Sequence, residues 1–207
     1  CDGDCDDNDA SLELDDADGD GYSVCDDDCN DADSDFFPTD SDGDGDEDFC
    51  GWIDLSAGWA HTCGVKSSGT VECWGYNYYG QSTPPSGTFK NVSAGANHTC
   101  GVMSDGSVNC WGYNVYGQST PPSGTFQSVR SGGEHTCGIN SSGSVECWGW
   151  DNYGQSTPPS GTFESVSAGN NHSCGVTTSG SLDCWGRNQD GQSSPPSGTF
   201  ESVDSDN

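Results

Sequence analysis

A 37-residue period runs through residues 52–199 without an insertion or a deletion. It is marked by two sets of cysteines and one set of histidines: Cys63, Cys100, Cys137 and Cys174; Cys73, Cys110, Cys147 and Cys184; His61, His98, His135 and His172. Strict repetition at this length is typical of stacked or radial repeats, whose units bury their apolar faces only against their neighbours. The period therefore predicts four like units, 52–88, 89–125, 126–162 and 163–199, and so regular an array argues against an enzyme.

The composition changes near residue 50. Residues 1–50 carry a net charge of −22 and no Lys or Arg, whereas the remainder carries −8. A field of this sign repels nucleic acid and anionic membranes and attracts divalent cations. Leu, Ile, Val and Phe make up only 25 of the 207 residues, so other stabilisation is needed. The 13 cysteines, few of them in CxxC pairs, predict disulfides and an oxidising, extracellular or cell-surface location.

Each unit contains a predicted β-hairpin. In the first copy, residues 63–73, the turn is Ser67-Ser68-Gly69, with glycine at the left-handed position of a three-residue loop. Counting back from that turn places Val65 opposite Val71 and Cys63 opposite Cys73, within disulfide reach. The same count pairs Cys100 with Cys110, Cys137 with Cys147 and Cys174 with Cys184. Closing such a loop contributes about 3 kcal/mol in the chain-entropy model.

The other repeated positions indicate packing and turns. The tryptophan after each second cysteine is predicted to face the opposite side of the sheet. A phenylalanine with a valine three residues later opens each following unit, the last being 200–203. Pro-Pro pairs occupy the connectors, where a missing N–H donor does no harm. No segment shows a useful helical period, so the chain is predicted to be all-β.

The run Ala-Gly-x-x-His-Thr-Cys-Gly-Val…Gly-x-Val-x-Cys-Trp-Gly-x-Asn-x-x-Gly-Gln resembles the RCC1-like propeller repeat, in its disulfide-bearing secreted form. The resemblance covers residues 52–203 and implies four tandem propeller-type blades. Closed members of that family have seven blades, so the four form either an open arc or part of a larger ring. The resemblance also implies a habit of binding proteins through blade loops. The family's chromatin-bound nucleotide-exchange role does not carry over to a chain with four basic residues.

The acidic segment, 1–51, contains calcium-loop spacings. Carboxylates at positions 1, 3, 5 and 12, a glycine at 6 and a backbone carbonyl at 7 fit an EF-hand-type loop; these are Asp16, Asp18, Asp20, Asp27, Gly21 and Tyr22. The front half recurs at Asp40, Asp42, Asp44, Asp46 and Asp48, and more weakly at Asp31, Asp33 and Asp35. The cofactor predicted here is Ca²⁺; the competing interpretation is a solvated acidic linker.

This segment also resembles thrombospondin type 3 calcium repeats and related bacterial surface motifs. Disulfides in that family link one repeat to the next, which implies Cys5–Cys25 and Cys29–Cys50 and leaves Cys1 over. The alternative pairing, Cys1–Cys5 and Cys25–Cys29, leaves Cys50 instead. An odd cysteine in an exported chain predicts a bond to another segment or subunit.

The two ends of the chain resemble halves of one motif. Residues 204–207, Asp-Ser-Asp-Asn, are similar to the first half of a calcium loop, and residues 1–5 to the second half. Joined tail to head they would complete a motif. This pattern predicts self-association in a longer array or a head-to-tail polymer.

Three further sets of residues are candidates. Each repeated histidine is expected to be buried and hydrogen-bonded rather than a metal ligand. Aromatic residues crowd the segment after each Trp-Gly and are either a sugar- or protein-binding strip or filler between units: Tyr76, Tyr78, Tyr79, Tyr113, Tyr116, Trp150 and Tyr153. Four sequons predict N-glycosylation: Asn91, Asn97, Asn140 and Asn171.

No catalytic motif or unique acid–base pair stands out. The sequence predicts a non-catalytic extracellular structural or adhesive repeat protein, stabilised by calcium, as the subunit of a filament or glycosylated surface fibre. The alternative is a module that binds glycans or surface proteins through the aromatic loops. Neither nucleic-acid binding nor membrane insertion is expected.

Overall fold

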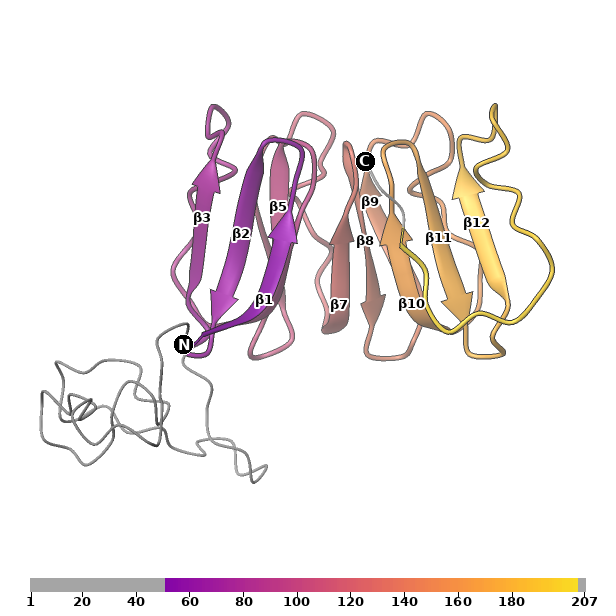
Figure 1. The fold of residues 1–207 in the computed structure, drawn as a ribbon, viewed down its shortest axis with the longest axis horizontal. Helices are drawn as coiled ribbons and strands as arrows, with labels where there is room; N and C mark the ends of the chain where they lie inside the picture. The colour runs from indigo at the N-terminus through magenta and orange to yellow at the C-terminus, as the bar shows by residue number, and fades with distance from the viewer. Residues whose placement is uncertain (1–50, 205–207) are drawn as a thin grey trace, which may run out of the picture. The chain divides into compact units, whose positions relative to one another are not determined.

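The computed structural model describes residues 51–204. It contains twelve antiparallel strands in four three-stranded sheets, each formed by strands consecutive in the chain (Figure 1). The strands are β1 (Trp52–Ala57), β2 (His61–Lys66), β3 (Val71–Gly75), β4 (Phe89–Ala94), β5 (His98–Met103), β6 (Val108–Gly112), β7 (Phe126–Ser131), β8 (His135–Asn140), β9 (Val145–Gly149), β10 (Phe163–Ala168), β11 (His172–Thr177) and β12 (Leu182–Gly186). The all-β prediction and the four units, called blades 1 to 4, are confirmed.

The predicted hairpin register is correct in every blade. Cys63 lies opposite Cys73 and Val65 opposite Val71, and the same pairing joins Cys100 to Cys110, Cys137 to Cys147 and Cys174 to Cys184. All four pairs are disulfides. In blade 2 the turn glycine, Gly106, has φ of +85°, a conformation in which other residues are strained. Turn chemistry therefore sets the register, and the register brings the sulfur atoms together.

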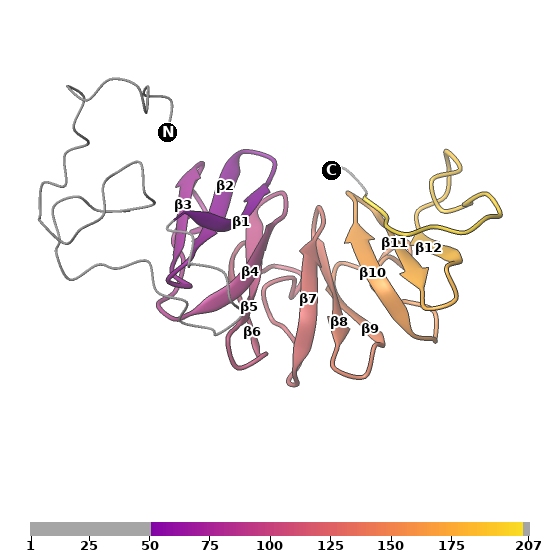
Figure 2. The same cartoon turned by 60° about the horizontal axis from the view of Figure 1, so that its bottom comes forward.

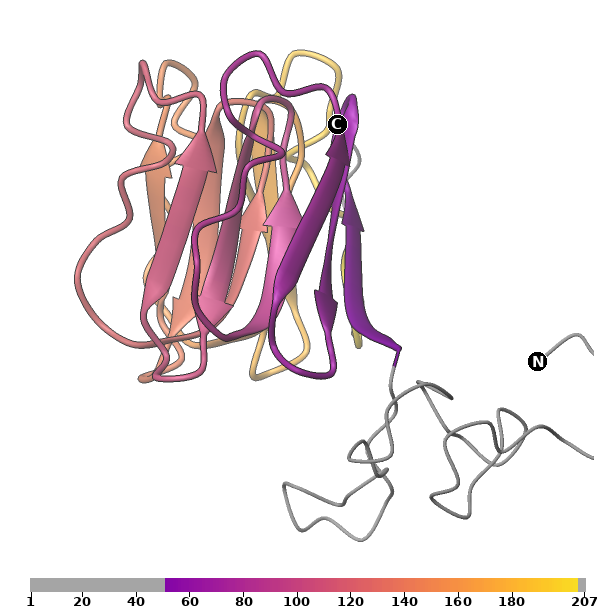
Figure 3. The same cartoon turned by 90° about the vertical axis from the view of Figure 1, so that its left-hand side faces the viewer.

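The blades stand side by side along an open arc in chain order (Figure 2). Successive blades keep the same upright orientation, so that their loops gather at two ends of the strands (Figure 3). The first strand of each blade lies on the concave side of the arc and the third on the outside. Across residues 51–204 there is no helix with the length and apolar character needed to span a membrane.

Most of the core lies between blades. In the cluster between blades 1 and 2, Cys63 and Val65 of β2 contact Phe89 and Val92 of β4 and Trp111 of β6. Equivalent clusters join blades 2 and 3 and blades 3 and 4. The disulfide and the tryptophan of one blade therefore face opposite neighbours, as predicted from strand alternation. A blade cannot bury these residues alone, which explains why the fold needs repeats.

Hydrogen bonds repeat between the blades in the same way. The Thr99 hydroxyl donates to the Gln81 carbonyl over 3.1 Å and therefore accepts from His61 Nε2, 2.8 Å away. Trp111 Nε1 donates to the same carbonyl over 2.9 Å. Because Nε2 carries the proton, the buried Nδ1 of His61 is an acceptor, and it has no partner among the described residues. The same three contacts recur at the next two junctions. We call each junction a seam.

The end of the array differs from the prediction. Residues 200–203 form no strand, although the Phe200 N–H donates to the Gly180 carbonyl as its counterparts do. No hairpin follows within the described residues to accept a strand there, and a lone strand leaves its backbone groups unpaired. His172 is correspondingly less buried than His98 and His135. The predicted opening strand of a fifth blade is therefore wrong.

Candidate functional site

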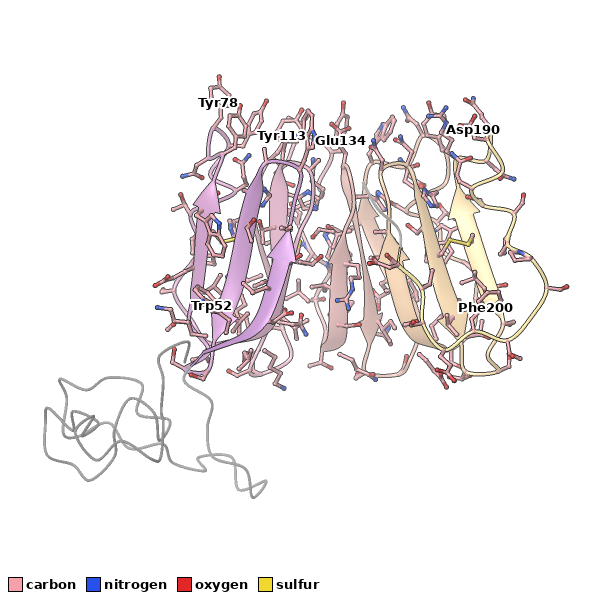
Figure 4. All side chains as sticks on the ribbon, in the orientation of Figure 1. Trp52, Tyr78, Tyr113, Glu134, Asp190 and Phe200 are labelled. Atoms are coloured by element: carbon pink, nitrogen blue, oxygen red, sulfur yellow. A yellow bond between two sulfur atoms is a disulfide. The ribbon has the colours of Figure 1, made fainter. Side chains whose placement is uncertain are left out.

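One end of the strands carries the chemically most varied loops of the molecule. Two loops per blade meet there: the link between its first and second strands, and the segment after its third strand. We call this end the loop face, comprising residues 58–60, 95–97, 132–134, 169–171, 76–79, 113–116, 150–153 and 187–190. Tyr78, Tyr113, Glu134 and Asp190 all stand along it (Figure 4).

The aromatic residues singled out in the sequence form one continuous row on this face. Ring centroids within blade 1 are 6.4 Å apart for Tyr76–Tyr78 and 4.9 Å for Tyr78–Tyr79. Tyr79 crosses to Tyr113 of blade 2 at 4.7 Å. The row continues through Tyr113–Tyr116, Tyr116–Trp150 and Trp150–Tyr153, at 6.4, 6.1 and 5.4 Å. These spacings lie within the contact range of aromatic pairs. We call this row the aromatic ridge.

The ridge is exposed, not buried between blades. Tyr78 is 78% exposed, and Tyr76, Tyr79, Tyr116 and Tyr153 are each more than 40% exposed. Such a stretch of apolar ring surface on a small domain indicates an interaction site. This exposure favours the binding strip over filler between blades, while the contacts Tyr79–Tyr113 and Tyr116–Trp150 also join neighbouring blades. The seams are filled by phenylalanine, tryptophan, valine and the disulfides instead.

Hydrogen bonds hold the ridge loops in shape. The backbone N–H of Tyr79 donates to the side-chain oxygen of buried Gln81 over 2.9 Å. Asn77 accepts from the Ser82 N–H over 2.8 Å, and its amide donates to Thr83 over 2.8 Å. Blade 2 repeats these bonds. Blade 3 has Asp151 in place of the asparagine, so its carboxylate accepts from both the Ser156 N–H and the Thr157 hydroxyl. The rings are thus presented by preorganised loops, which lowers the entropic cost of binding.

The ridge stops at blade 4. The positions of Tyr76 and Tyr79 are there taken by Arg187 and Asp190, which form an ion pair of 3.3 Å. The backbone arrangement is unchanged, since the Arg187 N–H still donates to the Asn171 carbonyl as its counterparts do. The fourth blade therefore keeps the loop and loses the aromatic surface.

Two adjoining hollows lie beside the ridge. The first, about 350 Å³, is lined by Trp59, Ala60, Tyr76, Tyr79 and Asn97. The second, about 360 Å³, is lined by Trp59, Ala96, Asn97, Gly133, Glu134, Asn170 and Asn171. Trp59 and Asn97 line both, so the two hollows adjoin on the loop face, and we call them together the groove. Each volume falls within the range of about 300–1,000 Å³ that is common for small-molecule sites.

Glycine allows the loops to approach closely along this groove. The Ala96 N–H donates to the Gly132 carbonyl across the blade junction over 3.2 Å. A Cβ atom at Gly95 would collide with that same carbonyl oxygen and with the His98 ring. This glycine is present in all four blades. It therefore allows the two residues that follow it, which differ between blades, to lie next to the neighbouring blade and line the groove.

The groove is mildly acidic. The loop face carries three carboxylates, Glu134, Asp151 and Asp190, against the single guanidinium of Arg187. Burial raises the pKa of Glu134 above its ordinary value. Burial, with the neighbouring Tyr116, Glu134 and Tyr79, also raises the pKa of Tyr113. A neutral or cationic ligand is therefore electrostatically favoured over an anion.

A further cavity of about 690 Å³ lies on the concave side and shares Trp59 with the two hollows. Most of its lining comes from the first strands of the blades, including Asp54, Ser93, Arg130 and Ser131, and Asp204 adds a carboxylate from outside the strands. Arg130 replaces a serine found at the equivalent position of the other blades. Its Nη1 donates to the adjacent Val129 carbonyl.

The repeated histidines are structural. His98 and His135 are fully buried, and both donate from Nε2 to a hydroxyl of the next blade. Burial lowers the pKa of His98 to about 3 and that of His135 to about 4. Within residues 51–204, no three His, Cys, Asp or Glu side chains gather into a metal-binding group. The interpretation as buried, hydrogen-bonded histidines is confirmed at these positions.

The predicted glycosylation residues lie in different settings. Asn97 and Asn171 line the groove. Asn140, at the end of β8, donates to Glu146 and accepts from Ser142 and Ser144, whereas the Asn91 side-chain oxygen is buried on β4. The predicted calcium residues of segment 1–51 and the cysteines Cys1, Cys5, Cys25, Cys29 and Cys50 lie outside the described residues.

Sequence reasoning missed Trp59 and Glu134. Both lie between the Gly and the His of the Gly-x-x-His run, at positions where none of the other three blades has the same residue. Trp59 stands where Ala96, Gly133 and Asn170 stand in the other copies. Comparing the copies position by position would have marked this loop, because a residue that packs a repeated seam has no reason to vary.

Comparisons with known proteins agree with this architecture. The family model described as the regulator of chromosome condensation (RCC1) repeat matches residues 52–81, 89–118, 126–155 and 163–192. The CRINKLY WD40 ectodomain of the Arabidopsis thaliana receptor kinase ACR4 is 32% identical over 71% of this chain and 52% of its own, with a TM-score of 0.57. The entire ectodomain of the Physcomitrella patens receptor kinase CR4 is 30% identical over 73% of this chain and 46% of its own, with a TM-score of 0.63.

Prp20p of Saccharomyces cerevisiae shares the fold at 18% identity, over 70% of this chain and 45% of its own, with a TM-score of 0.60; its binding to Gsp1p and histones has been studied. The chain spans about half the length of these solved structures. A search of curated proteins found no match. The matched repeats cover more than half of the sequence, and the chain belongs to the family of proteins built from RCC1 repeats.

Proposed function

We propose that this chain is a non-catalytic extracellular recognition domain that binds its partner on the loop face. The observation that carries the proposal is the aromatic ridge, a continuous row of rings spanning three blades. Exposed tyrosine and tryptophan supply large contact area at low conformational cost. The loops that carry the ridge are held by internal hydrogen bonds. The surface is therefore preorganised, which lowers the entropic cost of binding a partner.

Several observations support an extracellular setting. Each described blade contains one disulfide, and disulfides persist in oxidising compartments. Two structurally similar proteins are receptor-kinase ectodomains. The blades are near copies, and Asp190 of the ion pair with Arg187 is 75% exposed, so neither the repeats nor this pair marks a catalytic site.

The test compares adhesion of the fluorescently labelled full chain to intact cells and extracellular material. The double variant Tyr79→Ser, Tyr116→Ser is expected to reduce adhesion at least ten-fold while the melting temperature stays within a few degrees. The matched control is Gln127→Ser, an exposed residue of β7 away from the loop face. Equal adhesion of the double variant and the control would remove the loop face from the function.

Calcium binding is a second proposal, and it rests on the spacing Asp16, Asp18, Asp20 and Asp27 alone. Calcium would neutralise part of the −22 charge of segment 1–50. A calcium ion shared between residues 204–207 of one chain and residues 1–5 of the next would promote head-to-tail assembly. Mass analysis and electron microscopy with and without EDTA test it. Calcium-dependent multimers are expected, whereas a monomer under both conditions would rule out the assembly.

A further inference from the structure

We propose that the groove beside the aromatic ridge binds a neutral saccharide, with Trp59 as the stacking platform and Asn97, Glu134 and Asn171 as hydrogen-bonding partners. This inference rests on the proposed function, because it assigns a ligand class to the same face. It adds residues that the ridge does not contain.

Trp59 is placed as a platform and not as a packing residue. Its side chain is 76% exposed, and it makes no ring contact with any other residue of the described part of the chain. Only its backbone is tied down, by a hydrogen bond from its N–H to the Gly95 carbonyl. A pyranose ring has a face of polarised C–H groups, and such a face lies well on the electron-rich face of an indole.

The polar lining of the groove has unused hydrogen-bonding capacity. The side chains of Asn97, Asn170, Asn171 and Glu134 make no hydrogen bond to other residues within 51–204. The backbone carbonyls of Asn97, Glu134 and Asn171 are engaged, because each accepts from the N–H of the residue that follows the third strand. Each amide offers both donors and an acceptor, and the carboxylate offers acceptors. Neighbouring hydroxyls of a sugar also present donor and acceptor together, so they match this lining more closely than an apolar side chain of a protein does.

Charge selects a neutral ligand. Glu134 is the one charged residue that lines either hollow, and the domain as a whole is acidic. A uronic acid or sulfated sugar would therefore be repelled. A quaternary ammonium ion is the competing ligand, since aromatic residues and a carboxylate also attract cations. The largely exposed Trp59 and the three amides form an open, polar groove instead of a closed aromatic cage.

The experiment uses the full chain produced in a bacterial periplasm, so that no N-linked glycan occupies Asn97. Affinity electrophoresis is run in gels that contain cellulose derivatives, mannan, galactan, glycol chitin or polygalacturonate. Retardation by at least one neutral polysaccharide is expected. Trp59→Ala should weaken it at least ten-fold and Glu134→Gln measurably. The control, Val115→Ala, changes a residue of the same face that is 69% exposed and lines neither hollow, and it should leave retardation unchanged.

Adhesion to cells separates this inference from the proposed function. Mild periodate oxidation destroys vicinal diols of surface glycans and leaves most protein surfaces in place. Loss of loop-face-dependent adhesion after periodate treatment is the expected result. Adhesion that survives periodate, or that choline competes away, would overturn the saccharide while leaving the loop face as the binding surface. Retardation by polygalacturonate alone, or equal retardation of wild type and Trp59→Ala, would also overturn it.

Discussion

The seams and the loop face of this protein use the same residue types for opposite purposes. Trp148, in a seam, is 8% exposed and donates its indole N–H to the Gln118 carbonyl over 2.9 Å. Trp59, on the loop face, is 76% exposed and has no ring contact within the described blades. The seam residue recurs in every blade and the loop residue occurs in one. Repetition therefore marks what holds the array together, and variation marks where a partner can be recognised.

The largest expected effect comes from removing a seam tryptophan. Trp148→Ala should lower the free energy of unfolding by about 3–5 kcal/mol, because it leaves a cavity and removes one of the two hydrogen bonds to the Gln118 carbonyl, which keeps the bond from Thr136. Trp74→Ala is the matched control, since the same repeat position is 49% exposed in blade 1. Denaturant unfolding measures both. Equal losses for the two variants would contradict the role assigned to the seams.

Removal of one hairpin disulfide should have the next largest effect. The double variant Cys137→Ser, Cys147→Ser is expected to cost up to about 3 kcal/mol, mainly by freeing the unfolded chain. Both sulfur positions also contact the seam between blades 3 and 4, so blade 4 should become more accessible to protease than blade 2. Hydrogen exchange measured blade by blade shows where the structure opens. Equal protection of all four blades in the variant would contradict the predicted local opening of blade 4.

Acid should weaken the seams through the buried histidines. The folded-state pKa values of about 3 for His98 and about 4 for His135 lie below the ordinary 6.5, so the folded state binds fewer protons. The stabilisation is complete above about pH 6.5 and is lost as the pH falls, down to about 3 for His98 and about 4 for His135, by about 1.4 kcal/mol per pH unit for each histidine. Unfolding followed from pH 7 to 4 tests this slope.

A variant at one of these histidines sharpens the acid test. His135→Gln keeps a donor and removes the titration, so its stability should depend less steeply on pH than that of the wild type. Carboxylates elsewhere titrate equally in both proteins, and the difference between the two slopes isolates the histidine. Parallel pH curves would show that the acid response originates outside the seams.

The smallest effect on stability is expected for Trp59→Ala. Its exposed ring contributes no packing, so the free energy of unfolding should change by less than about 0.5 kcal/mol. The same substitution is expected to have the largest effect on saccharide binding. Thermal unfolding beside affinity electrophoresis measures both, and a stability loss comparable to that of Trp148→Ala would place Trp59 in the fold and not in the site.

Local rules were sufficient to predict most of the blade. The Ser-Ser-Gly turn sets the hairpin register, and the register places Cys63 opposite Cys73 before any tertiary contact is considered. Strand alternation then sends the following tryptophan to the other face. These are near-neighbour relations, which a single repeat contains in full.

The binding surface could be predicted only in part. The aromatic residues were recognised, but the choice between strip and filler depended on whether neighbouring loops meet at the ends of the strands or between the sheets. Trp59 and Tyr79 lie at one end of blade 1 because of its strand order, whereas Asn97 of blade 2 joins them in one hollow only through the seam. Segment 200–203 has the composition of a first strand and forms none, because a strand needs a partner that its own sequence does not contain.

The sequence by itself determined the period, which the repeats show directly, and the all-β blades with their four hairpin disulfides, because the hairpins follow from turn chemistry and strand alternation within one unit. It also predicted that the histidines are buried, but their hydrogen-bond partners lie in the next blade. Only the tertiary structure decided that the aromatic rings form one exposed ridge, that a groove with Trp59 lies beside it, and that the four sheets stay open as an arc. Those properties depend on how one blade packs against the next, and the packing contacts join residues of different repeats.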